Sequence, residues 1–160
     1  MIDAAWSDRL IQFFTEMLEF YKRFLGLESE KYTKVVSGQL NELDSFMKQE
    51  QAFLLKSRGM EQERLEILEK AGAPKTTFRE MIPLLEPARQ ESMKKLYEEI
   101  TTTISKLQNM NKKCSQMTRL KLGQISRILS NLEDHPELKQ IYGNKLQNAA
   151  KPEGTFSRKI

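Results

Sequence analysis

The side chains that most often catalyse reactions or bind metals are scarce in this chain, which has one cysteine and one histidine. A metal centre inside a helical bundle usually draws a Glu-x-x-His motif from each of two helices, and a nucleophilic cysteine needs a base beside it. His135 lies in EDHPE, which predicts a turn, and Cys114 lies on an apolar helical stripe, where a free cysteine usually acts as a small buried hydrophobe. The seven glycines are scattered singly, so the sequence has no glycine-rich phosphate loop. We therefore expect a protein that is not an enzyme and that uses no cofactor and no metal.

The stretch LQNMNKKCSQMTRLKLG, residues 107–123, could instead bind nucleic acid. The sequence has no acidic residue between Ile100 and Leu132, and a helix with only positive charges could follow a phosphate backbone. However, no aromatic residue lies between Tyr97 and Tyr142 to stack on bases. We therefore expect no nucleic-acid partner, and we interpret this basic face either as a solvated surface or as one that attracts an acidic protein. The basic residues in this interval are Lys106, Lys112, Lys113, Arg119, Lys121 and Arg127.

The composition favours a few long helices. Lys, Glu, Leu and Met are abundant and are good helix formers, whereas only seven Gly and five Pro are available for turns. The net charge of +4 is too small to indicate a nucleic-acid partner by itself. The sequence MIDAAWSDRL lacks the basic and apolar regions of a secretory signal, and no apolar run approaches the roughly 18 residues of a membrane span. We expect a cytoplasmic protein without membrane insertion.

Apolar residues at helical spacing predict three long helices. The first covers residues 3–36, where apolar side chains recur at steps of three and four residues, and the second covers residues 39–71. A connector at 75–87 contains TFRE, which has the spacing of a capping box, but Pro83 limits it to one or two helical turns. The third long helix covers residues 87–133 and starts with a proline, which suits the first helical position. The predicted fold class is all-α: an antiparallel helical hairpin packed on one longer C-terminal helix.

The predicted helices differ in length. The first two, at roughly 33 residues, reach about 50 Å, whereas the last, at roughly 46 residues, reaches about 70 Å. The short connector ties the start of the last helix to the end of the second, so the C-terminal end of the last helix must project beyond the hairpin. Uncovered apolar residues on that end would mark an interaction site. These residues are Leu120, Leu122, Ile125, Ile128, Leu129 and Leu132.

The segment after the last helix has a second, shorter apolar pattern. Its spacing of i, i+3, i+4 and i+8 is typical of one or two amphipathic helical turns, which either fold back on the bundle or help to hold a partner helix. The residues of this pattern are Leu138, Ile141, Tyr142 and Leu146. We expect one helical domain over residues 1–146 and a disordered tail over residues 147–160, because the tail is polar and contains Pro and Gly.

Several stretches of the sequence resemble the FlgN family of flagellar export chaperones. YTKVVSGQLNELDSF resembles the end of that family's first helix and the turn into a leucine-patterned second helix. EQAFLLKSRGMEQERLEILEKAG is similar to the Glu-rich end of the second helix, which carries an arginine. LQNMNKKCSQM resembles an L-N-x-x-N stretch of the long last helix, with Met110 and Asn111 in matching places, and IYG at 141–143 looks like the Tyr-Gly that follows it.

The resemblance implies a small helical chaperone of the flagellar type III export system. Such proteins bind the C-terminal amphipathic helices of the hook-filament junction proteins, which are also called hook-associated proteins. They keep these clients from assembling early and deliver them to the export apparatus, and they use no nucleotide or metal. In this family the C-terminal region is the binding part, which agrees with the projecting end expected from the helix lengths. The alternative is a coiled-coil adaptor or structural protein that self-associates as a homodimer through the same apolar stripe.

Overall fold

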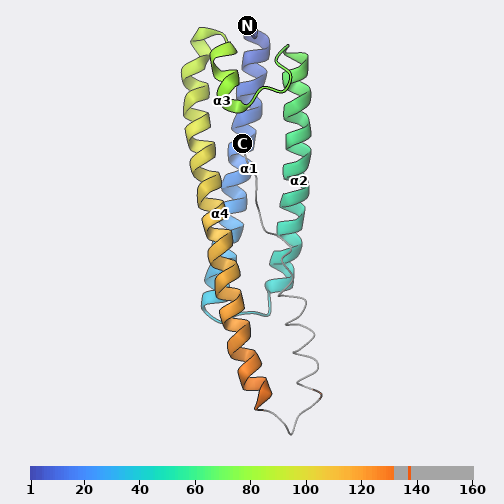
Figure 1. The fold of residues 1–160 in the computed structure, drawn as a ribbon, viewed down its shortest axis with the longest axis vertical. Helices are drawn as coiled ribbons and strands as arrows, with labels where there is room; N and C mark the ends of the chain where they lie inside the picture. Colours follow the sequence, from blue (N-terminus) through green and yellow to red (C-terminus); the bar gives the residue numbers. More distant parts are fainter. Residues whose placement is uncertain (132–136, 138–160) are drawn as a thin grey trace.

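Long helices make up the part of the molecule that the computed structural model describes, which is residues 1–131 and 137. The elements are α1 (Ala4–Val36), α2 (Leu43–Lys70), α3 (Phe78–Met81), the 3₁₀ turn η1 (Ile82–Leu84) and α4 (Pro87–Ser130). α1 and α4 run in the same direction and α2 runs in the opposite one, while α3 and η1 lie across one end of this elongated bundle (Figure 1). This arrangement confirms the all-α prediction. None of the described helices is both long enough and apolar enough to cross a lipid bilayer.

α1 has caps at both ends. The side chain of Asp3 accepts a hydrogen bond from the backbone N–H of Trp6 at 2.9 Å, as an N-cap does. At the other end, the hydroxyl of Ser37 donates to the carbonyl of Thr33 at 3.0 Å, and Gly38 has a φ of +76°, the left-handed conformation that commonly ends a helix. The apolar side chains spaced by three and four residues along α1 are buried: Leu10, Phe13, Met17, Phe20, Phe24 and Leu27.

α2 begins later than the sequence predicts. The pattern predicts a start near residue 39, but the helix begins at Leu43, without a side-chain hydrogen bond at the capping residue Glu42. The backbone N–H of Leu40 bonds to the carbonyl of Gly38, and that of Leu43 bonds to the carbonyl of Leu40, so these residues form the turn between the two helices. The prediction was wrong here because a chain reversal between antiparallel helices needs several residues that the apolar pattern does not mark.

The connector between α2 and α4 contains the predicted capping box. The hydroxyl of Thr77 accepts from the backbone N–H of Glu80 at 3.3 Å, and the carboxylate of Glu80 accepts from the backbone N–H of Thr77 at 3.0 Å. One α-helical turn follows, and Pro83 falls in the 3₁₀ turn η1. The backbone N–H of Ile2 donates to the carbonyl of Leu84 at 2.7 Å, which ties the start of the chain to this connector.

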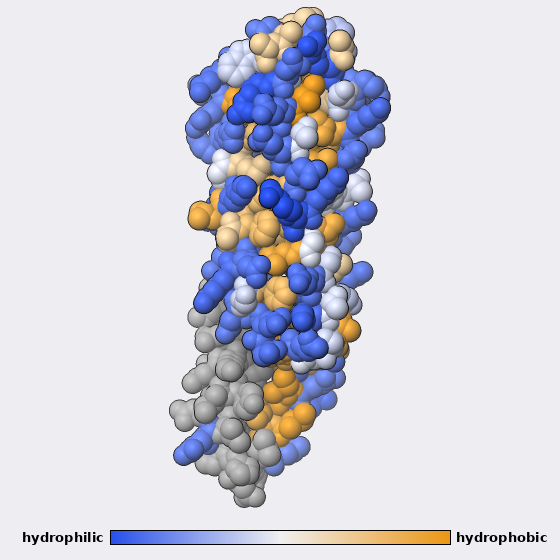
Figure 2. Space-filling model, turned by 180° about the vertical axis from the view of Figure 1, so that it is seen from behind, coloured by the Kyte–Doolittle hydropathy of each residue, from blue (hydrophilic) through white to orange (hydrophobic). Residues whose placement is uncertain are grey.

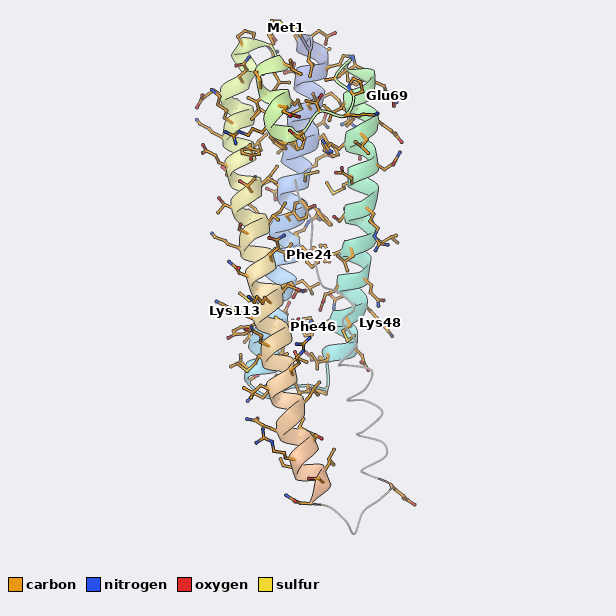
Figure 3. The ribbon with its side chains drawn as sticks, viewed as in Figure 1. Met1, Phe24, Phe46, Lys48, Glu69 and Lys113 are labelled. Carbon is orange, nitrogen blue, oxygen red and sulfur yellow. The ribbon has the colours of Figure 1, made fainter. Side chains whose placement is uncertain are left out.

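Aromatic side chains join the connector to the long helices. The ring of Phe78 lies 3.9 Å, centroid to centroid, from Phe14 of α1 and 5.1 Å from Tyr97 of α4. Lower in the bundle, Phe24 of α1 stacks at 4.9 Å on Phe53 of α2, and Figure 3 shows Phe24 between these helices. The main apolar core therefore lies in the upper and middle parts of the bundle.

α4 is the longest helix, and its C-terminal end extends beyond the turn between α1 and α2 (Figure 1). It has 44 residues, against 33 in α1, so at about 1.5 Å per residue it is the longer of the two by more than a full helical turn. Pro87 occupies the start of the helix, as predicted. α1 and α2 form the predicted antiparallel hairpin, and α1 packs more extensively along the parallel helix α4 than along α2.

Candidate partner-binding site at the end of the long helix

The C-terminal part of α4 presents two exposed apolar side chains. Leu120 is 52% exposed and Ile128 is 62% exposed, so both are among the most exposed large hydrophobic residues that the structure describes. Leu122 and Ile125 are partly buried, and Leu129 is buried. Figure 2 shows apolar surface on the lower part of the molecule, where α4 projects. The described residues of the predicted site therefore range from exposed to buried.

The apolar residues of this end lie on more than one face of α4. Leu122, Ile125 and Leu129 are spaced by three and four residues, so they share one face. Two residues advance an α-helix by about 200°, so Leu120 lies almost opposite Leu122. Ile128 lies between these two directions. A partner helix that covers Leu122 and Ile125 therefore covers Ile128 more readily than Leu120.

Half of the predicted site falls on residues that the structure does not describe. Leu132, Leu138, Ile141, Tyr142 and Leu146 lie outside the described residues, so their contribution to the site stays a prediction.

A buried polar cluster joins the three long helices just before α4 leaves the bundle. The ammonium of Lys31, on α1, lies 2.6 Å from a carboxylate oxygen of Glu50, on α2. Both Glu50 and Glu28 of α1 are almost completely buried, at 2% and 0% exposure, and Asn111 of α4 is buried with them. Two carboxyl groups and one ammonium group thus share a site that is shielded from bulk solvent, where a net negative charge is costly.

Burial and, next, the neighbouring charge of Glu50 together raise the pKa of Glu28 to about 7, while Lys31 opposes the change. Burial lowers the pKa of Lys31, but the charge of Glu50, the hydrogen bond to Glu50 and the charge of Glu28 together outweigh burial and leave that pKa above its ordinary value. Glu28 is therefore partly protonated near neutral pH, while Lys31 remains charged.

Cys114 belongs to the same cluster. Its thiol is buried and donates to the backbone carbonyl of Glu28 at 3.4 Å. Burial raises its pKa to about 12, with Glu28 as the next cause, so the thiol stays protonated and is a poor nucleophile. This confirms the prediction that Cys114 is a small buried side chain. Within residues 1–131 and 137, no three His, Cys, Asp or Glu side chains are placed to hold a metal ion.

Comparison with protein families matches residues 1–150 to the family described as FlgN protein. The chain belongs to the FlgN family. The match covers all of α1 to α4 and continues past the described residues. Comparison with curated proteins and comparison with solved structures give no match.

Membership of the FlgN family gives the helical bundle a general role. FlgN proteins are chaperones of flagellar export, and the family is one of chaperones rather than of enzymes. The projecting end of α4 and the buried cluster above it are thus features of a flagellar export chaperone. The sequence pattern located the projecting end, but it did not identify Glu28 and Lys31 as buried charged residues.

Proposed function

We propose that this chain is a cytoplasmic chaperone for hook-filament junction proteins and binds their C-terminal amphipathic helices on the projecting end of α4. It keeps these clients from assembling before export and delivers them to the export apparatus. Its family supports a flagellar export chaperone, and the observation that carries the finer assignment is the exposed side chain of Ile128 beside the partly buried Ile125, beyond the support of α1 and α2.

The physical basis of this binding is helix-in-groove recognition. The assembly helices of a client present an apolar stripe that would otherwise meet other copies of the client. Covering that stripe with Ile125, Ile128 and Leu122 removes apolar area of both proteins from water. Each large aliphatic side chain that becomes fully buried contributes roughly 1.5–3 kcal/mol, and less if it is already partly buried. A few such residues are enough for specific and reversible binding.

The test is calorimetric titration with the C-terminal segment, roughly 40 residues, of a hook-associated protein from the same organism. We expect the wild-type chain to bind it and the variant Ile125→Gln/Ile128→Gln to bind at least about tenfold more weakly, since tenfold corresponds to about 1.4 kcal/mol. A chain that ends at Glu133 tests the predicted contribution of Leu138, Ile141, Tyr142 and Leu146. If these residues help to hold the client, this shorter chain binds more weakly than the full one.

The matched control is Leu55→Gln/Leu65→Gln on α2, where the side chains are exposed, at 70% and 39%. Circular dichroism verifies that both variants keep the helical fold. Equal weakening by the two double variants would contradict the location of the site, and no binding by the wild-type chain would contradict the function.

Self-association through the same surface is the second candidate. The exposed positions Leu120 and Ile128 could pair with those of a second copy, which would make the chain a homodimeric adaptor. Light scattering separates the two functions. A tight dimer that the client does not dissociate favours the adaptor, whereas a monomer that forms an equimolar complex favours the chaperone.

A further inference from the structure

The lower two thirds of α4 carry six positive charges and no negative charge. These residues are Lys106, Lys112, Lys113, Arg119, Lys121 and Arg127. All of them are exposed except Lys121, which is partly buried, and Figure 3 shows Lys113 pointing away from the bundle. Because the whole chain has a net charge of only +4, the rest of the protein is net acidic. The positive charge is therefore concentrated on this part of α4.

The six basic residues form no ion pair with the described residues, whereas several basic residues near the hairpin and the connector do. Arg9 pairs with Glu63 at 2.9 Å, Arg64 with Glu61 at 2.8 Å, and Arg89 with Asp8 at 2.8 Å. None of the six on α4 has a carboxylate of residues 1–131 or 137 within 4.0 Å. Their charges are available to a second molecule.

Two of these charges border the apolar site. Arg119 precedes Leu122 by three residues, and Lys121 precedes Ile125 by four, so each lies next to an apolar residue on the helix surface. Because Arg119 and Lys121 are two residues apart, they lie about 200° apart around the helix, one on each side of the face that carries Leu122 and Ile125. The apolar site thus has a positive charge along each edge.

We propose that the helix which binds the end of α4 carries acidic side chains along both edges of its apolar stripe, opposite Arg119 and Lys121. This inference rests on the proposed function and specifies the chemistry of its client. Apolar contact gives affinity, while the complementary charges set the register of the two helices and speed their encounter. A client helix with basic edges is rejected, because like charges would meet along the whole contact.

A protein helix fits this surface better than a nucleic acid does. Leu120, Ile125 and Ile128 lie among the basic residues, and nucleic-acid backbones offer nothing to cover aliphatic side chains. α4 also has no aromatic residue after Tyr97 that could stack on bases. The regularly spaced phosphates of a duplex would leave the apolar surface exposed.

The experiment measures binding of the same client segment to the full chain and to Arg119→Glu/Lys121→Glu, at about 50 mM and about 500 mM salt. The control variant is Lys94→Glu/Lys95→Glu, which makes the same change in total charge on the exposed upper part of α4. At low salt we expect the first variant to bind at least about tenfold more weakly and the control to change affinity less than about threefold. Wild-type binding should weaken at high salt, where charges are screened.

A second probe is the client segment with its Asp and Glu changed to Asn and Gln. Compared with the unmodified segment, we expect this neutral segment to bind the wild-type chain more weakly. We expect it to bind Arg119→Glu/Lys121→Glu more tightly. Equal binding of the unmodified segment by wild type and Arg119→Glu/Lys121→Glu would overturn this inference and leave the proposed function intact. Failure of the wild-type chain to bind would overturn both. Binding of duplex DNA as tight as that of the client would overturn the inference in favour of a nucleic-acid partner.

Discussion

Glu28 makes the stability of the bundle depend on pH. Burial and, next, the charge of Glu50 raise the pKa of Glu28 from 4.5 to about 7. Lys31 and the Asn111 side chain oppose this rise, because both favour the charged form of Glu28. The neighbouring Cys114 thiol stays neutral. Between pH 4.5 and 7 the folded chain therefore holds a proton that the unfolded chain has released. The stabilisation from Glu28 is complete below about pH 4.5 and is lost as the pH rises through about 7.

Replacing Glu28 with Gln should remove this dependence. Gln has the shape of the protonated acid but carries no charge at high pH, so we expect Glu28→Gln to be more stable than the wild type at pH 8, by roughly 1–3 kcal/mol. The difference should shrink towards pH 5. Urea unfolding of both proteins across this range measures it, and two parallel stability profiles would contradict the raised pKa of Glu28.

Lys31 is the only cation close to the two buried carboxyl groups among the described residues. Lys31→Met keeps the length of the side chain but leaves Glu28 and Glu50 without a positive charge, so we expect a loss of about 3–5 kcal/mol at pH 7.5. Acid should recover part of this loss, because protonation removes the uncompensated charge. A loss below about 1 kcal/mol, or one that is the same at pH 5, would show that the ion pair does little for the fold.

Sequence spacing and residue type disagree in this cluster. Glu28 lies four residues after Phe24, so the helical repeat places it on the buried face, while its charge argues for solvent. Asn111 is a similar case, because the pattern predicts it at the border of the stripe beside Met110, yet it is buried and Met110 is only partly buried. The residue pattern within a single helix cannot predict such positions, because each buried charge depends on partners from other helices.

The ends of the helices follow local chemistry, so the sequence predicts most of them. Asp3, the Thr77 capping box and Pro87 all do what their residue types favour. The start of α2 was mispredicted because the apolar pattern continues through residues that form the turn. The predicted amphipathic turns after α4 lie outside the described residues.

A substitution at Gly123 tests the local stability of the C-terminal end of α4. It lies inside the helix, and a Cβ atom added there would meet nothing within 4 Å. We expect Gly123→Ala to stabilise this part of the helix by about 0.5–1 kcal/mol and to slow amide exchange around it about two- to fivefold. Native-state hydrogen exchange measures this, and unchanged or faster exchange would contradict a continuous helix at this point.

The matched substitution is Gly38→Ala, where the φ of +76° suits glycine and not alanine. It should destabilise the turn between α1 and α2 by about 1 kcal/mol and leave exchange at the end of α4 unchanged. Because both substitutions replace glycine with alanine, a difference between them reports the backbone conformation at each position.

At the scale of the whole molecule, the difference in helix length determines the architecture. The upper bundle holds the aromatic core and the connector, the buried charged cluster lies below it, and the end of α4 continues past the α1–α2 turn. Helix lengths and the position of the connector were enough to predict which end projects. They could not predict that α1 packs best on α4, because the apolar pattern of one helix does not identify the helix that it packs against.

The most direct test of the account is a hydrogen-exchange footprint of the full chain with and without the C-terminal segment of a hook-associated protein. We predict slower amide exchange on binding from Cys114 to Ser130, with little change in α2 and in the connector, because the client covers the projecting end of α4. A bound client that protects α2 or the connector and leaves the end of α4 unchanged would contradict the central claim.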